Sequence, residues 1–169
     1  MVEVFGIPII FGSKFKNSGK VNHIASVMAE LLDQDGDGCA DDPNVLRNIL
    51  IKSESKKIAM VVGNNEQTGV TTAASNAMKQ KGYILGQNLF FGEVIPKCSG
   101  LNFTSACSDA SIEEQFHFIT TYGYKSAYSK IFGTTWSSPS NLTKAMDIAR
   151  YFFGFNFHTS RKAICNYSF

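Results

Sequence analysis

The residues with the clearest chemistry are five aspartates that fall within ten positions: Asp33, Asp35, Asp37, Asp41 and Asp42. The first three alternate with other residues and are followed by Gly38, where the chain can turn sharply. Ca²⁺ is a hard cation that takes about six to eight oxygen ligands, and a short loop can supply them from alternate residues. Carboxylates packed this closely repel one another without a cation, so we expect a calcium-binding loop. The alternative is an acidic turn in solvent, because Asp and Gly are ordinary turn residues.

If Asp33 is position 1 of a twelve-residue calcium loop, Asp33, Asp35 and Asp37 fall at the ligand positions 1, 3 and 5. Cys39 at position 7 would bind through its backbone carbonyl, and Asp41 at position 9 would bind directly or through water. The pattern resembles the calcium loop of EF-hands and dockerins, with a helical pattern on each side over about residues 21–52. Position 12, which is a bidentate Glu in such loops, is Asn44 here. We therefore expect weaker Ca²⁺ binding, with a Kd of about 10⁻⁴–10⁻³ M, unless Asp42 takes the place of that Glu as a ligand. The predicted calcium ligands are Asp33, Asp35, Asp37, Cys39, Asp41 and Asn44.

A second group of candidate ligands lies in the segment Glu113-Glu114-Gln-Phe-His117. Each carboxylate is three or four residues from the imidazole, so either one can share a helix face with it. With His158 as a third ligand beside Glu113 and His117, a Zn²⁺ with an open position would activate water for hydrolysis. Glu114 and His117 would then be the catalytic residues. The alternatives are that Glu114 caps the helix together with Ser111 and that His117 is a surface residue.

Length and composition limit the class of protein. The chain has 169 residues, 44% of them hydrophobic, which suits one domain with a sizeable core and excludes a disordered chain. The net charge of +2 is uneven, because the acidic loop carries −5 and the nine other acidic residues face sixteen basic ones, a balance of +7. The basic residues are scattered, so we expect no nucleic-acid partner. No apolar run approaches the ~20 residues of a membrane-spanning helix, so we expect no membrane span.

The cysteines and glycosylation sequons favour an extracellular protein. Four cysteines form no C-x-x-C pair, and an even count allows two disulfides: Cys98 with Cys107 is the easiest short closure, and Cys39 with Cys165 would then remain. Four buried thiols are the alternative. Sequons begin at Asn102, Asn141 and Asn166. We therefore expect a secreted, disulfide-linked glycoprotein whose signal peptide is already absent, because Met1 opens directly on a strand-like segment.

Hydrophobic periodicity predicts the elements that position these residues. We expect strands over 2–11 and 57–62, extended chain over 83–95, and helices over 21–32, 43–50, 69–81, 111–122 and 142–153. Asp42 should cap the second helix, with Pro43 in its first turn. Ile112, Phe116 and Ile119 should face inward from the helix over 111–122. The sequence therefore predicts a single α/β or α+β domain over 1–169, with a small central sheet packed by amphipathic helices and one EF-hand-like helix–loop–helix.

Several segments in order resemble a poorly characterised family of secreted proteins. They are the opening VEVFGIPI, the stretch Leu32–Val45, the Glu-Glu-x-x-His helix with its Gly-Tyr over Glu113–Tyr124, and Ala145–Arg150. The resemblance spans most of the chain and groups the acidic loop with the Glu-Glu-x-x-His helix without naming a reaction. It also implies that relatives continue past Phe169 with another acidic, aromatic segment that could complete a site.

These observations favour a secreted module in which Ca²⁺ stabilises an extracellular binding or structural domain. A metal-dependent hydrolase, with Zn²⁺ as its ion, is the alternative from a different class. A subunit of an extracellular assembly is a second alternative, with exposed Phe and Tyr as its contact. The expected partners are an extracellular protein, a glycan or a second copy of the chain.

Overall fold

The structure is a computed structural model, and it describes residues 1–12, 15, 19–63, 78–96, 109–133 and 140–153. Its elements, in chain order, are β1 (Val2–Val4), β2 (Ile7–Phe11), α1 (Gly19–Leu32), α2 (Pro43–Lys56), β3 (Ile58–Gly63), β4 (Ile84–Phe90), α4 (Ala110–Ile119), the π-helix η3 (Thr120–Tyr124), α5 (Lys125–Ala127) and α6 (Asn141–Phe153).

A four-stranded mixed sheet lies at the centre, in the order β1-β2-β3-β4. β1 and β2 are antiparallel, whereas β2, β3 and β4 run parallel to one another. The single strand predicted over 2–11 is wrong: the chain turns back at Phe5 and Gly6, whose φ angles are 49° and 80°. Two successive positive φ values are typical of a tight hairpin turn whose twist matches that of its strands.

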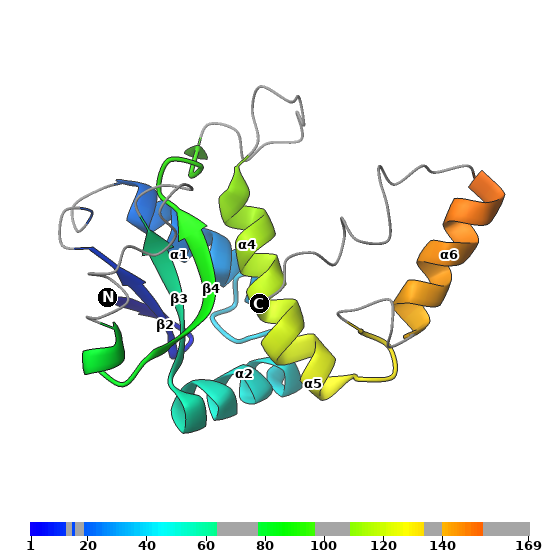
Figure 1. Ribbon diagram of the computed structural model, residues 1–169, viewed down its shortest axis with the longest axis horizontal. Helices are drawn as coiled ribbons and strands as arrows, with labels where there is room; N and C mark the ends of the chain where they lie inside the picture. Colours follow the sequence, from blue (N-terminus) through cyan, green and yellow to red (C-terminus); the bar gives the residue numbers. More distant parts are fainter. Residues whose placement is uncertain (13–14, 16–18, 64–77, 97–108, 134–139, 154–169) are drawn as a thin grey trace.

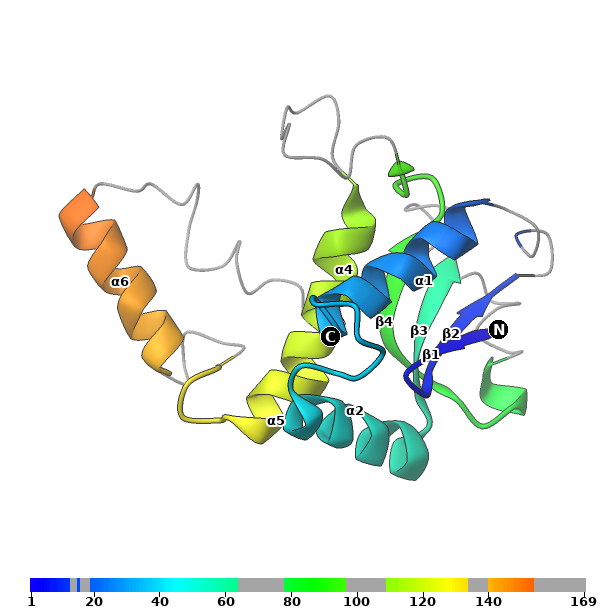
Figure 2. The same ribbon diagram turned by 180° about the vertical axis from the view of Figure 1, so that it is seen from behind.

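The main core lies between the sheet and the helices α1, α2 and α4; Figure 2 shows α1 in front of the strands and α2 below them. β3 is buried along its whole length, as expected for a central parallel strand. Its residues Ile58, Met60 and Val62 face the helices, which contribute the buried side chains Ile24, Met28, Val45, Ile49 and Phe118. The predicted α/β class, with a small sheet packed by amphipathic helices, is confirmed.

The helix predicted over 111–122 is longer and rotated from the expected orientation. It begins at Ala110 and continues without a break through η3 into α5 (Figure 1). Ile112 and Phe116, predicted to face inward, are 36% and 51% exposed, whereas Ile119 is buried as expected. The inward face also carries Ser111 and Gln115, both fully buried. Asp109 and Ser111, at the start of this helix, make polar contacts with His23 of α1.

α6 is the last described element, and the helix predicted over 69–81 is described only in part. α6 stands apart from the sheet in both views (Figures 1 and 2), and its bounds agree closely with the predicted helix over 142–153. Of the helix predicted over 69–81, residues 69–77 lie outside the described residues, and 78–80 are helical. Within the part of the chain that the structure describes, no helix has the length and apolar character needed to cross a membrane.

Candidate metal centre

The acidic loop connects α1 to α2 and is fixed at both ends by the helices. The Asp33 N–H donates to the Ala29 carbonyl at 2.8 Å and so continues the hydrogen-bond pattern of α1. At the other end, Oδ1 of Asp42 accepts from the backbone N–H groups of Asn44 and Val45 at 3.0 and 3.1 Å. The predicted cap and the proline in the first turn of α2 are confirmed. The loop is therefore the middle of a helix–loop–helix.

Three of the predicted calcium ligands converge in this loop. Asp33, Asp35 and Asp37 each place a carboxylate oxygen so that all three oxygens lie within 4.8 Å of one another. Asp35 and Asp37 are exposed, and Asp33 is half-buried at the end of α1. Three hard anionic oxygens at this spacing can coordinate one cation of the size of Ca²⁺.

Backbone N–H groups hold these carboxylates in place. Oδ1 of Asp33 accepts from Gly36 at 2.9 Å and Asp37 at 3.1 Å, and its Oδ2 accepts from Gly38 at 2.9 Å. Oδ1 of Asp37 accepts from Cys39 at 2.7 Å. Gly36 and Gly38 have φ angles of 72° and 87°, a region that disfavours other residues. The loop is therefore pre-organised by its own backbone, with the glycines supplying the turns.

The remaining predicted calcium ligands are less closely gathered. Asp41 lies outside the group of three carboxylates, and its Oδ2 accepts from the Gln34 N–H at 2.9 Å. Asn44 is exposed in the first turn of α2. Cys39 is exposed with a free thiol, while the other three predicted disulfide cysteines lie outside the described residues.

Asp42 is occupied by other contacts, so it is poorly placed to replace the missing Glu at position 12. Its Oδ1 caps α2, and its Oδ2 accepts from the Tyr128 hydroxyl at 2.8 Å. Burial, followed by the charges of Asp42 and Asp41, raises the pKa of the neighbouring Tyr124. Tyrosines from η3 and the end of α5 thus lie against the carboxyl-terminal end of the acidic loop.

The predicted second metal group is only partly assembled. His117 lies on α4 with its Nε2 3.8 Å from Oε1 of Glu113; the Glu113 side chain is exposed, and the His117 side chain is partly buried. Glu114 does not cap the helix with Ser111: Asp109 is the cap, and its carboxylate accepts from the Ser111 N–H at 3.1 Å. The Glu114 carboxylate instead accepts from the Gln87 side chain. His158, the predicted third ligand, lies outside the described residues.

Glu114 nevertheless has an unusual environment for a carboxylate. Burial raises its pKa above the ordinary value of 4.5, although the hydrogen bond from Gln87 and the proximity of His117 oppose the change. A carboxyl group with a raised pKa near a histidine is a feature that active sites share with some structural networks.

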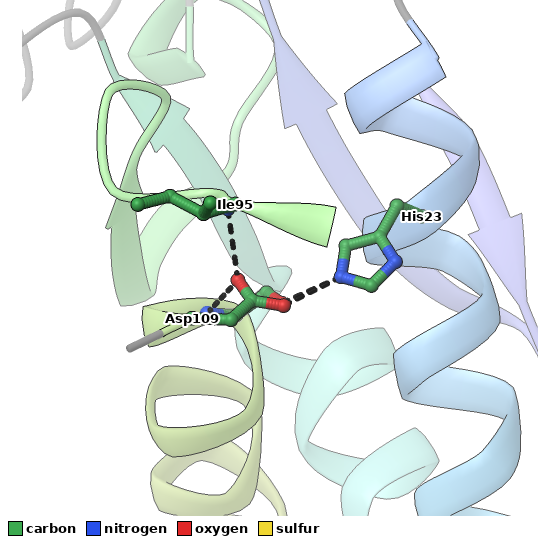
Figure 3. A network of polar contacts seen from close by, with 4 residues as sticks. His23, Ile95 and Asp109 are labelled. Carbon is green, nitrogen blue, oxygen red and sulfur yellow. Dashed lines mark hydrogen bonds and ion pairs between the residues drawn. The ribbon is translucent and has the colours of Figure 1, made fainter. Parts of the chain in front are cut away.

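The structure also brings together a histidine and an aspartate that the sequence did not connect. His23 of α1 lies against Asp109 before α4, with 2.6 Å between Nε2 and Oδ2 (Figure 3). The Asp109 side chain is fully buried, and the His23 side chain is 16% exposed. The two residues are 86 positions apart, so no spacing in the sequence could have paired them.

Asp109 accepts several hydrogen bonds that favour its ionised form. Burial alone would raise its pKa, but bonds from the Ser111 and His23 side chains and from the N–H groups of Ser111 and Ile95 lower it below the ordinary 3.8. The Ile95 bond measures 3.2 Å and is drawn in Figure 3. A carboxylate held by this many donors stays charged at neutral pH.

None of the predicted site residues lines the cavity found at the opposite end of the sheet. This cavity of about 360 Å³ lies beside the hairpin turn and the end of α2, where its lining includes Glu3, Glu54, Lys57 and Tyr83.

Comparisons of the chain with protein-family models, curated proteins and solved structures found no match. The resemblance to a family of secreted proteins therefore stays a prediction.

Proposed function

We propose that the protein is a secreted calcium-binding module in which Ca²⁺ bound by the loop between α1 and α2 stabilises an extracellular binding or structural domain. The convergence of Asp33, Asp35 and Asp37 is the observation that carries this proposal. The four cysteines and three sequons support the extracellular assignment, where millimolar Ca²⁺ would fill a weak site.

The loop is placed so that a cation would act on the whole fold. Its ends are the last residue of α1 and the cap of α2, and both helices contribute side chains to the main core. A bound Ca²⁺ would relieve the repulsion among three carboxylates that the backbone holds together. Because only the folded loop gathers these ligands, the binding free energy adds to the free energy of unfolding.

Thermal unfolding with and without Ca²⁺ tests this proposal. With a Kd of about 10⁻⁴–10⁻³ M, 10 mM Ca²⁺ stabilises the fold by about 1.4–2.7 kcal/mol, which raises the Tm of a chain of this size by about 3–10 °C. D37N should abolish most of the increase, whereas D147N, which changes an exposed aspartate on α6, should keep it. An unchanged Tm in the wild type, or an equal increase in D37N, would rule out a stabilising site in this loop.

A metal-dependent hydrolase is the second candidate function. The pKa of Glu114, which burial raises, supports it, because a buried carboxyl group beside a histidine can serve as a general acid or base. Glu113, His117 and His158 would hold Zn²⁺. Metal analysis after Zn²⁺ loading separates the two functions: stoichiometric zinc that disappears in H117A supports the hydrolase, and unchanged zinc in H117A ends this proposal.

An assembly subunit is the third candidate. Phe116 and Ile112 project from the outer face of α4 with half and about a third of their surfaces exposed, and a patch of this kind can bind a partner. Light scattering with and without chelator would detect a calcium-dependent oligomer. A monomer under both conditions would contradict self-assembly.

A further inference from the structure

The cavity beside the hairpin turn is bordered by three segments that lie far apart in the sequence. They are the hairpin of β1 and β2, the last turn of α2 with Lys57, and Tyr83 just before β4. Figure 2 shows these segments together below the strands. The volume of about 360 Å³ falls within the usual range of small-molecule sites, about 300–1,000 Å³. All of the lining residues belong to the described part of the chain.

The walls of this cavity are held together without a ligand. An added Cβ at Gly6 would lie 3.1 Å from Leu50 Cδ2, so the hairpin turn packs directly against α2. The Lys57 carbonyl accepts from the Ile84 N–H at 3.0 Å, which joins the end of α2 to the start of β4. A cavity that is already formed by such contacts is typical of small-molecule sites.

Three charged side chains border the cavity, and none of them forms an ion pair with any described residue. Glu3 of β1, Glu54 of α2 and Lys57 are all exposed. The Lys57 side chain lies along Gly82, where an added Cβ would be 3.3 Å from Nζ. The ammonium group is therefore on the β4 side of the cavity, whereas Glu3 belongs to the opposite edge strand of the sheet.

Two hydroxyl-bearing residues also line the cavity. Ser53 is 8% exposed, and its buried Oγ has no hydrogen-bond partner among the described residues. Tyr83 is half-buried at the β4 side. A buried hydroxyl without a partner is unfavourable and uncommon in native proteins, and a polar ligand beside Ser53 would supply the missing partner.

Lys57 occupies a backbone position that usually carries glycine. Its φ and ψ angles of 50° and 45° are the left-handed conformation in which many helices end. Glycine is common there because it has no Cβ, and other residues in this conformation are strained. The chain thus keeps a cationic side chain at the cavity in a conformation that disfavours it.

We propose that this cavity binds a free basic amino acid of the lysine type. Two carboxylates and one ammonium group complement a ligand with two ammonium groups and one carboxylate. Lys57 and the Tyr83 hydroxyl bind the ligand carboxylate, and Glu54, three residues before Lys57, binds the α-ammonium group. Glu3 binds the side-chain ammonium group, and Leu50 packs against the methylene chain. The carboxyl-terminal end of α2 adds negative potential that favours the ammonium groups.

An amide NMR titration of the whole chain with L-lysine at low ionic strength tests this proposal. We expect saturable shifts at Gly6, Ser53, Lys57 and Tyr83. The expected Kd is about 1 mM, because a small ligand bound by exposed charges gains little free energy. The shifts should persist with chelator, which separates this site from the calcium proposal.

Variants of the charged residues should weaken the binding. E54Q and K57Q should each raise the Kd about two- to fivefold, the usual effect of losing one exposed ion pair. E30Q is the matched control, because Glu30 is an exposed glutamate of α1 that does not line the cavity. It should leave the Kd unchanged.

Ligand analogues test the same contacts in the wild type, even if a variant does not fold. Cadaverine lacks the carboxylate and Nα-acetyl-L-lysine lacks the α-ammonium group, so both should bind more weakly than L-lysine. K57Q should lose the preference over cadaverine, and E54Q should lose the preference over Nα-acetyl-L-lysine. If Nα-acetyl-L-lysine bound as tightly as L-lysine, the ligand would be the carboxyl-terminal lysine of a peptide, and the proposal of a free amino acid would be wrong.

Three further results would overturn the proposal. The first is the absence of saturable shifts up to about 20 mM L-lysine, well above the expected Kd. The second is an equal Kd for L-lysine and cadaverine in the wild type. The third is an unchanged Kd for L-lysine in a folded K57Q.

Discussion

At the scale of single residues, the Tyr128 hydroxyl adds a contact between the end of the acidic loop and the segment that follows α5. The Tyr128 hydroxyl donates to Asp42 Oδ2 at 2.8 Å, while the other oxygen of Asp42 caps α2. One carboxylate therefore joins the loop, α2 and the end of α5. This contact has no counterpart in the sequence pattern of calcium loops, and it explains why Asp42 is not a spare ligand.

Removing this hydroxyl should destabilise the fold. We expect Y128F to lower the free energy of unfolding by about 1–3 kcal/mol, the usual range for a hydrogen bond to a charged group. Urea denaturation measures the change. Y83F is the matched control, because the Tyr83 hydroxyl has no hydrogen-bond partner among the described residues, and it should stay within about 0.5 kcal/mol of the wild type. Equal effects of the two substitutions would show that the contact with Asp42 contributes nothing.

Asp109 predicts a specific acid dependence. Its pKa is lowered in the folded state, so its contribution to stability is complete above the ordinary value of 3.8 and is lost as the pH falls through the folded value. Between about pH 5 and pH 2, the Tm of D109N should fall less steeply than that of the wild type. Parallel Tm profiles for the two proteins would contradict the lowered pKa.

At the scale of elements, the close approach of η3 to α2 depends on a glycine. A Cβ at Gly123 would lie 2.6 Å from Val45 Cγ1 and 3.1 Å from Ile49 Cδ1. Both of these side chains belong to the buried core, so neither can move without disturbing its neighbours. The contact keeps Tyr124 of η3 and Tyr128, which follows α5, beside the acidic loop.

G123A should therefore be destabilising. Overpacking of this kind costs about 1–3 kcal/mol, which chemical denaturation can resolve. At Gly19, the first residue of α1, an added Cβ would meet nothing within 4 Å. G19A should be neutral or stabilising by up to about 1 kcal/mol. If G123A were as stable as G19A, the packing of η3 against α2 would differ from the one described.

The elements that the sequence predicted well are those with a strong local signal. Helical spacing identified α1, and Asp42 before Pro43 located the start of α2. The rotation of α4 could not be predicted, because apolar spacing placed Ile112 and Phe116 inside. The buried face instead carries Ser111, Gln115 and Phe118. Asp109, just before α4, contacts His23 of α1, 86 positions away, and no local pattern specifies such a contact.

The candidate sites also differ in whether local sequence features or long-range contacts form them. Asp33, Asp35 and Asp37 converge because alternation and the following glycine are local features. Glu114 was predicted to be catalytic, with a helix cap as the alternative, and its carboxylate accepts a hydrogen bond from the Gln87 side chain of β4. That contact depends on how α4 crosses the sheet, which no local pattern specifies.

At the scale of the whole molecule, the charge is divided between one loop and the remaining chain. The loop carries −5 and the rest +7, so a bound Ca²⁺ would change the net charge from +2 to +4. His23 lies near the first turn of α1, whereas the acidic loop follows the last turn of the same helix.

Calorimetric titration of the metal-free protein with Ca²⁺ tests the central claim most directly. We predict one Ca²⁺ per chain with a Kd of about 10⁻⁴–10⁻³ M, and no binding when Asp33, Asp35 and Asp37 are all replaced by Asn. The absence of binding heat up to about 10 mM Ca²⁺, well above this Kd, would contradict the claim. So would heat of the same size in the folded triple variant.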